Sequence, residues 1–269
     1  MRVLFLGDVV GNPGRTAIKQ NLKDQINKNN IDFVIANGEN AADEGTGITK
    51  KISEDFFNYG VDVITTGNHV WDQKETAEYI NTESRLLRPL NLIKPSPGKG
   101  FEIYKSNSGF KVGVLNLMGN VFMKKCENVF EIAKMFLLKN KLRSDYDFLF
   151  VDFHGEITSE KMAMGHFFDG NATLLVGTHT HVPTNDARIL NFGTAYQTDA
   201  GMCGDYNSVI GMNKENSIKK FLKEDSKKHF PSNGIASLSG VIVDCDKKTG
   251  LAKNVQNYIY GGDLKNTHL

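Results

Sequence analysis

The stretch Gly177-Thr178-His179-Thr180-His181 follows a run of small and apolar residues, 172–176. Such a run, ended by a glycine, predicts a buried strand that leads into a loop at its carboxyl end, the edge where open α/β folds place their sites. Residues two apart in an extended loop point the same way, so His179 and His181 can face one point, and imidazole is a common metal ligand. The pair alone is equally compatible with two exposed loop residues, so further ligands are needed.

Four other apolar runs also end in polar residues of the kinds that bind metals. The runs are 3–6, 31–36, 61–65 and 148–153, and helices are expected after the first three, over 12–28, 49–59 and 71–80. Successive strand–loop–helix units predict an α/β fold. The polar residues after the four runs are Asp8, Glu39 with Asn40, Asn68 with His69, and His154.

The remaining elements include antiparallel pairs. Residues 101–104 and 111–117 predict a hairpin, and strands are expected over 188–190, 195–198, 235–245 and 252–260. Further helices are expected over 128–141, from residue 158, and over 214–223. The chain has 269 residues, of which 40% are hydrophobic, and no Pro-, Gly- or Ser-rich linker, so we expect one domain over 1–269.

Composition excludes several classes of protein. The 32 basic and 31 acidic residues nearly balance, so there is no strong nucleic-acid footprint and no basic membrane patch. The first apolar run is too short for a signal peptide, and no run could span a membrane, so a cytoplasmic protein is expected. A homo-oligomer is left open. The three cysteines have no CxxC spacing, which argues against a thiolate zinc site and favours buried thiols; they are Cys126, Cys203 and Cys245.

Five strand ends with carboxylate, amide and imidazole side chains favour a metal site. Each residue has a simpler explanation, such as a helix cap for Asp8 or Asn68, a solvated acid for Glu39, or a packed imidazole for His154, but the coincidence of five argues for binding. This mixture suits iron, manganese or zinc better than calcium. One metal would use about half of the donors, so two are expected, with Glu39 as the bridging carboxylate, as in phosphatases and nucleases.

The blocks of this pattern resemble the calcineurin-like metallophosphoesterases, whose motifs run D-x-H, G-D, G-N-H-D/E, H and G-H-x-H. Four positions depart from that pattern: Val10, Glu39, Val70 and Thr178 replace a histidine, an aspartate, an acid and a histidine. The departures are themselves similar to the bacterial YmdB-like branch of that superfamily over the full length. The strings that carry this resemblance are LGDVVGNPGR, ANGENAADEGTGIT, TGNHVWD, DFHGE, VGTHTHV, GTAYQTDAGM and YNSVIGM.

The resemblance implies a four-layer α/β/β/α sandwich with two mixed sheets and a phosphodiesterase acting on 2′,3′-cyclic nucleotides. It also implies two metal sites that share Glu39, and it favours iron, with manganese next and zinc less favoured. The first site would use Asp8, Glu39, Asn40 and His181, and the second would use Glu39, Asn68, His154 and His179.

His69 follows a predicted ligand, so its ring can face the substrate and donate a proton to the leaving oxygen. The expected reaction is attack on a small phosphodiester by a hydroxide that bridges the metals, with His69 as general acid. A phosphomonoesterase or a nuclease with the same site stays open. A regulatory metal-binding protein with little turnover is a third alternative, against which the full ligand set and His69 argue.

Overall fold

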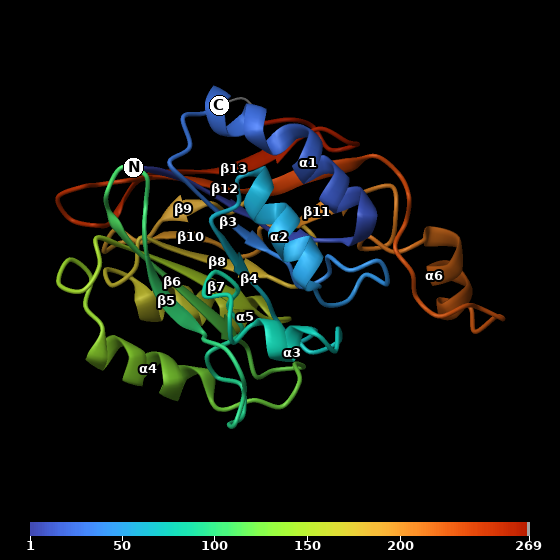
Figure 1. The fold of residues 1–269 in the computed structure, drawn as a ribbon, viewed down its shortest axis with the longest axis horizontal. Coiled ribbons are helices and arrows are strands. Elements are labelled where there is room, and N and C mark those ends of the chain that lie inside the picture. Colours follow the sequence, from blue (N-terminus) through green and yellow to red (C-terminus); the bar gives the residue numbers. More distant parts are fainter. Residues whose placement is uncertain (268–269) are drawn as a thin grey trace.

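The computed structural model describes residues 1–267, and within that range the chain forms two mixed β-sheets and six α-helices (Figure 1). This confirms the α/β class with two mixed sheets. The first sheet has the strand order β2-β11-β12-β1-β3-β4, with β13 paired to β12. Its strands are β1 (Arg2–Leu6), β2 (Asp8–Val9), β3 (Phe33–Asn37), β4 (Val63–Thr65), β11 (Met202–Asp205), β12 (Ala236–Cys245) and β13 (Ala252–Tyr260).

The second sheet has the order β5-β6-β7-β8-β10-β9. Strands β5 and β6 form the expected antiparallel hairpin, and β6, β7, β8 and β10 run parallel. The strands are β5 (Phe101–Lys105), β6 (Lys111–Met118), β7 (Phe148–His154), β8 (Leu174–Thr178), β9 (Arg188–Ile189) and β10 (Ala195–Gln197). The helices are α1 (Gly11–Lys28), α2 (Lys50–Tyr59), α3 (Thr76–Tyr79), α4 (Val129–Lys139), α5 (Thr158–Phe168) and α6 (Lys214–Phe221).

Strand alternation divides the apolar residues between the faces of each sheet. On β7, Phe148 and Phe150 belong to a cluster that also contains Phe5 and Ile35 of the first sheet, so the two sheets pack face to face. The alternate residues of β7 belong to a second cluster with Phe136 of α4 and residues of α5. A third cluster joins the other face of the first sheet to α1 and α2. Each fully buried aromatic or aliphatic side chain contributes about 1.5–3 kcal/mol to this packing.

Helices α1 and α2 lie on the side of the first sheet, and α4 and α5 lie on the side of the second (Figure 1). Between β1, β3 and β4 the pairing is parallel, as it is between β7 and β8, so the carboxyl ends of neighbouring strands meet at one edge of each sheet. Among the described residues, no helix combines the length and the apolar character that a membrane crossing requires.

Several boundaries differ from expectation. The helix expected over 71–80 is reduced to α3, because residues 68–75 form turns and bends held by contacts such as Gln73 Nε2 to the carbonyl of Thr46 at 2.9 Å. Helix α1 begins at Gly11 and not after an Asn12 cap. The short strands β2 and β11 were not expected. Cys203 and Cys245 are buried as predicted, whereas Cys126 is half-buried.

Candidate metal centre

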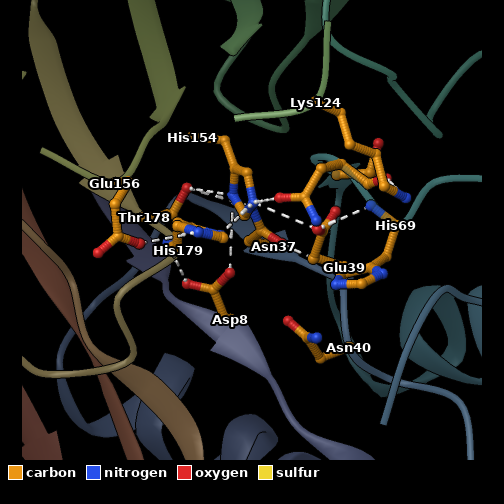
Figure 2. A network of polar contacts seen from close by, with 12 residues as sticks. Asp8, Asn37, Glu39, Asn40, His69, Lys124, His154, Glu156, Thr178 and His179 are labelled. Atoms are coloured by element: carbon orange, nitrogen blue, oxygen red, sulfur yellow. Dashed lines mark hydrogen bonds and ion pairs between the residues drawn. The ribbon is translucent and has the colours of Figure 1, made fainter. Parts of the chain in front are cut away.

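The structure brings all seven predicted ligands together where the sheet edges meet (Figure 2 shows five of them with labels). Asp8 lies in β2, Glu39 and Asn40 follow β3, and Asn68 follows β4. His154 is the last residue of β7. His179 and His181 lie in the loop after β8. Five of these side chains are buried: Asp8, Glu39, Asn40, His154 and His181.

One group of donors surrounds the ring of His154. Its Nε2 lies 3.1 Å from Asn68 Oδ1, 3.2 Å from Glu39 Oε1 and 3.1 Å from His179 Nδ1. The ring can approach this closely because residue 67 is glycine: a Cβ at that position would lie 2.2 Å from the imidazole. Carboxylate, amide and imidazole donors therefore converge on one point.

A second group of donors lies beside the first. His181 Nε2 is 3.2 Å from Asn40 Oδ1 and 3.9 Å from Asp8 Oδ1. The same Asp8 oxygen is 3.7 Å from His154 Nδ1, and Asp8 Oδ2 accepts a hydrogen bond from the backbone of His179 at 3.0 Å. Asp8 thus connects the two groups.

The histidine loop has an unusual backbone. His179 and His181 have φ angles of 99° and 65°, in the left-handed region that non-glycine residues seldom adopt and that costs on the order of 1–3 kcal/mol per residue. Thr180 between them is fixed by two hydrogen bonds to Asp199 Oδ2, from its backbone N–H at 3.1 Å and its hydroxyl at 2.7 Å. The surrounding structure therefore holds the two imidazoles in place against local strain.

Burial and mutual charge perturb the ionisable groups of the site. Burial acts to raise the pKa of Glu39, but the charge and hydrogen bond of His154 outweigh it and lower that pKa to about 2. Burial lowers the pKa of His154, but Glu39 and Asp8 outweigh it and raise that pKa to about 9. Burial raises the pKa of Asp8. The pKa of His179 falls to about 3, through burial and then the charge of His154.

The chemical types of these donors suit a metal ion. Asp8 Oδ1 and Glu39 Oε2 are buried and receive no hydrogen bond from residues 1–267, and buried carboxylate oxygens without a partner are rare in proteins. No three His, Cys, Asp or Glu side chains in that range are spaced as they would be around a bound ion. The donors instead contact one another at 3.1–3.2 Å. Two features therefore support metal binding: the two unpaired carboxylate oxygens and the chemical types of the donors.

His69 differs from the other histidines in its contacts. Its Nδ1 lies 2.7 Å from Asp72 Oδ2, which leaves Nε2 as the nitrogen that can face a substrate. Its backbone N–H donates to Glu39 Oε1 at 2.9 Å. Lys124 Nζ donates to the backbone carbonyl of Asn68 at 2.6 Å and lies beside His69 in Figure 2. The sequence reasoning missed Asp72, although it stands three residues after His69 in the quoted string TGNHVWD.

Each remaining imidazole has a partner on the nitrogen that faces away from the site. His154 Nδ1 contacts Thr178 Oγ1 at 3.0 Å, and His179 Nε2 contacts Glu156 Oε2 at 3.1 Å. His181 Nδ1 contacts a backbone carbonyl, that of Ile210, at 2.8 Å. Such partners fix ring orientation and tautomer. Thr178 and Glu156 stand in the quoted motifs, but their roles were not predicted.

Two mixed sheets with carboxylate, amide and imidazole side chains at their common edge are the arrangement that the resemblance to phosphoesterases predicts. The chain belongs to the YmdB-like protein family, whose model matches residues 4–258. It is 42% identical to a 2′,3′-cyclic-nucleotide 2′-phosphodiesterase of Bacillus subtilis over 98% of both chains.

Two solved structures are also similar over nearly the whole chain. One is described as a novel phosphatase from Mycoplasma pneumoniae, with 40% identity, a TM-score of 0.89, and coverage of 97% of this chain and 93% of that one. The other is a hypothetical protein from Thermus thermophilus, with 38% identity, a TM-score of 0.88, and coverage of 97% and 99%. These findings confirm the family resemblance in the sequence.

Proposed function

We propose that this protein is a metal-dependent phosphodiesterase that opens 2′,3′-cyclic nucleotides. The observation that carries the proposal is the pair of buried, unpaired oxygens, Asp8 Oδ1 and Glu39 Oε2, among three imidazoles and two amides. The substrate class comes from the name of the B. subtilis relative and from the extent of its similarity. The proposal treats the described chain as one domain with a four-layer α/β/β/α arrangement, which the three apolar clusters support.

The seven donors divide into two sets that share Glu39. Asp8, Asn40 and His181 would hold one ion with Glu39, and the other set, around His154, consists of Asn68, His154 and His179. The mixed donor set favours iron, with manganese next. When bound, two such ions supply an activated water and neutralise charge on the phosphoryl oxygens.

His69 is the proposed general acid. Asp72 accepts the hydrogen of Nδ1, so the Asp72 carboxylate orients the ring. Nε2 would then give its proton to the ribose oxygen that leaves as the cyclic phosphate opens. The link from the His69 backbone to Glu39 keeps this acid next to the proposed shared ligand.

A surface groove lies beside Asp72, the partner of His69. It has a volume of about 830 Å³ and is lined in part by Asp72, Gln73, Thr46 and Lys228. Ligand sites in proteins commonly occupy roughly 300–1,000 Å³.

A phosphomonoesterase with the same ligands is the second candidate, favoured by the description of the M. pneumoniae structure as a phosphatase. Metal-loaded protein should be assayed on 2′,3′-cyclic and 3′,5′-cyclic nucleotides, nucleoside monophosphates and single-stranded RNA, with metal content measured by elemental analysis. About two metals per chain and a preference for the 2′,3′-cyclic compounds are expected. Faster release of phosphate from monophosphates would replace the proposal with the phosphatase. Faster cleavage of RNA would indicate a nuclease, and metal binding without turnover would indicate a regulatory protein.

A further inference from the structure

Asp152 is a buried carboxylate at the end of the apolar layer between the two sheets. It lies on β7 two residues before His154, so both side chains continue the face that carries Phe148 and Phe150 between the sheets. Asp152 is only 1% exposed. A carboxylate in such a place is costly unless hydrogen bonds compensate for its lost hydration. Its contacts therefore indicate what it does.

Three donors satisfy Asp152. Its Oδ2 accepts from Asn37 Nδ2 at 2.8 Å and from the Thr65 hydroxyl at 2.5 Å. Its Oδ1 accepts from the Thr178 hydroxyl at 2.7 Å. Asn37 and Thr65 end strands of the first sheet, and Thr178 ends β8 of the second. One carboxylate thus connects the carboxyl ends of both sheets directly behind the candidate metal centre.

The contact to Thr178 fixes the direction of the next hydrogen bond. A hydroxyl has one hydrogen, and Thr178 donates it to Asp152, so Thr178 Oγ1 is an acceptor toward His154. His154 Nδ1 must then carry a hydrogen, and Nε2 is left as the nitrogen that faces Asn68 and Glu39. A metal can bind that nitrogen once Nε2 has no proton.

The hydrogen bond between Asp152 and Asn37 helps to place Glu39, the other proposed ligand. Asn37 donates to Asp152 through Nδ2, so its Oδ1 is free to accept, and it accepts the backbone N–H of Glu39 at 2.9 Å. Asp152 therefore orients an amide that holds Glu39 and a hydroxyl that holds His154. Asn37, Thr178, Glu39 and His154 lie near one another in Figure 2.

We infer that Asp152 is a positioning residue for two ligands of one metal. Through Thr178 it sets the Nδ1–H tautomer of His154, and through Asn37 it sets the position of Glu39. The inference rests on the proposed function, since it concerns the ligands of that site.

The test compares variants that keep side-chain shape. Asp152→Asn cannot accept from all three donors, and Thr178→Val removes the hydroxyl. Each is expected to weaken Mn²⁺ binding, measured by calorimetry on the metal-free full chain, by about 10- to 100-fold, the usual cost of losing such a partner. Thr178→Ser should restore the affinity lost in Thr178→Val. The double variant should lose little more than Asp152→Asn alone, because the Thr178 hydroxyl lies on a route that Asp152→Asn already breaks.

Thr173→Val is the matched control. Thr173 is equally buried, precedes β8 at its other end, and uses its hydroxyl to join Leu149 to Gly250. Its loss should lower stability without changing Mn²⁺ affinity. In parallel, ¹⁵N NMR of the histidine side chains in metal-free protein, at a pH high enough to make the His154 ring neutral, should show a hydrogen on His154 Nδ1 that is weakened or moved in Asp152→Asn and Thr178→Val.

The outcomes separate the two proposals. If wild-type protein binds Mn²⁺ but Asp152→Asn and Thr178→Val bind it equally well, the positioning role is wrong while the proposed metal centre stands. If Thr173→Val weakens binding as much as Thr178→Val, the effect is one of general stability, and the positioning role is again wrong. If wild-type protein binds neither Mn²⁺ nor iron, the proposed function itself fails, whatever the NMR spectra show.

Discussion

Lys161 and Asp199 form an ion pair closed to solvent, in which Lys161 Nζ donates to Asp199 Oδ2 at 2.6 Å and the two side chains are 0% and 1% exposed. Asp199 also holds Thr180 of the histidine loop and accepts from the backbone of Gly201 at 2.8 Å. The lysine stem passes over Gly177, where a Cβ would lie 2.8 Å from Lys161 Cδ. Helix α5 is thereby joined to the loop that carries His179 and His181.

Lys161→Met should destabilise the protein by about 3 kcal/mol, because it leaves the buried Asp199 without its cation. The value is at the lower end of the usual range, since the hydrogen bonds from Thr180 and Gly201 remain. Urea unfolding at neutral pH measures the change. Adding Asp199→Asn to Lys161→Met should recover part of the loss, since the unpaired charge is then gone. A loss below about 1 kcal/mol in Lys161→Met would show that the pair does not support this region.

Glu39→Gln tests the shared ligand. The amide keeps the size of the side chain but removes the charge of an oxygen that has no partner among the described residues. Metal content should fall from about two per chain to one or less, and turnover should fall at least about 100-fold, the upper end of what a mere supporting partner costs. Circular dichroism should stay unchanged, because the strands behind Glu39 are apolar. Turnover near the wild-type value would show that Glu39 is not the bridge.

Sequence reasoning predicted the central strands of both sheets because β1, β3, β4, β7 and β8 are largely apolar runs. A strand buried on both faces has that pattern. It also predicted which side chains would meet, since strand ends share an edge. It could not predict β2 and β11, two and four residues long, which pair with each other through a contact far apart in sequence. Strands this short have no periodicity to detect.

The supporting contacts of the site were missed for a related reason. Asp152 and Asn37 are 115 residues apart, and only the packing of one sheet on the other brings them together. A buried aspartate in an apolar strand was visible in the string DFHGE, but nothing in the string identifies its partners. The helix expected after β4 was overestimated because tertiary contacts of Asp72 and Gln73 hold those residues in turns.

Asp244→Asn tests a pH-dependent contribution to stability far from the site. Arg2 donates to both oxygens of Asp244, at 2.6 and 3.0 Å, across the pairing of β1 with β12. The Arg2 hydrogen bond holds the pKa of Asp244 below its usual value. A lowered pKa in the folded state means that the stabilisation is present above the unfolded pKa of about 3.9 and is lost as pH falls through the folded pKa.

The expected loss in Asp244→Asn is therefore about 0.5–1 kcal/mol at neutral pH, since roughly a third of each side chain is exposed and the pair is screened. The difference from wild type should shrink as pH falls below about 4. Urea unfolding measures it, down to the lowest pH at which the wild type unfolds in one cooperative step. If the difference in unfolding free energy between Asp244→Asn and wild type stays constant with pH, the loss arises from packing and not from the charge of Asp244.

His69→Ala separates proton transfer from metal binding. The alanine keeps the backbone N–H that donates to Glu39 and removes only the ring held by Asp72. If the ring protonates the leaving oxygen, turnover of a 2′,3′-cyclic nucleotide should fall by about 100-fold or more, because a ribose alkoxide is a poor leaving group. An activated aryl phosphodiester should be affected much less, since its phenolate leaves without a proton. Metal content should stay at the wild-type value.

The comparison of the two substrates decides between this role and a purely structural one. If His69 only orients Asn68, both substrates should slow equally in His69→Ala and metal content should fall. Asp72→Asn is the matched variant, because it keeps the ring and weakens its support at Nδ1, although it also weakens the ion pair of Asp72 with Lys124 at 3.5 Å. It should show the same selectivity for the cyclic nucleotide with a smaller loss, because the ring is present but less well oriented. Equal losses on both substrates in His69→Ala, with less metal bound, would remove His69 from the chemistry.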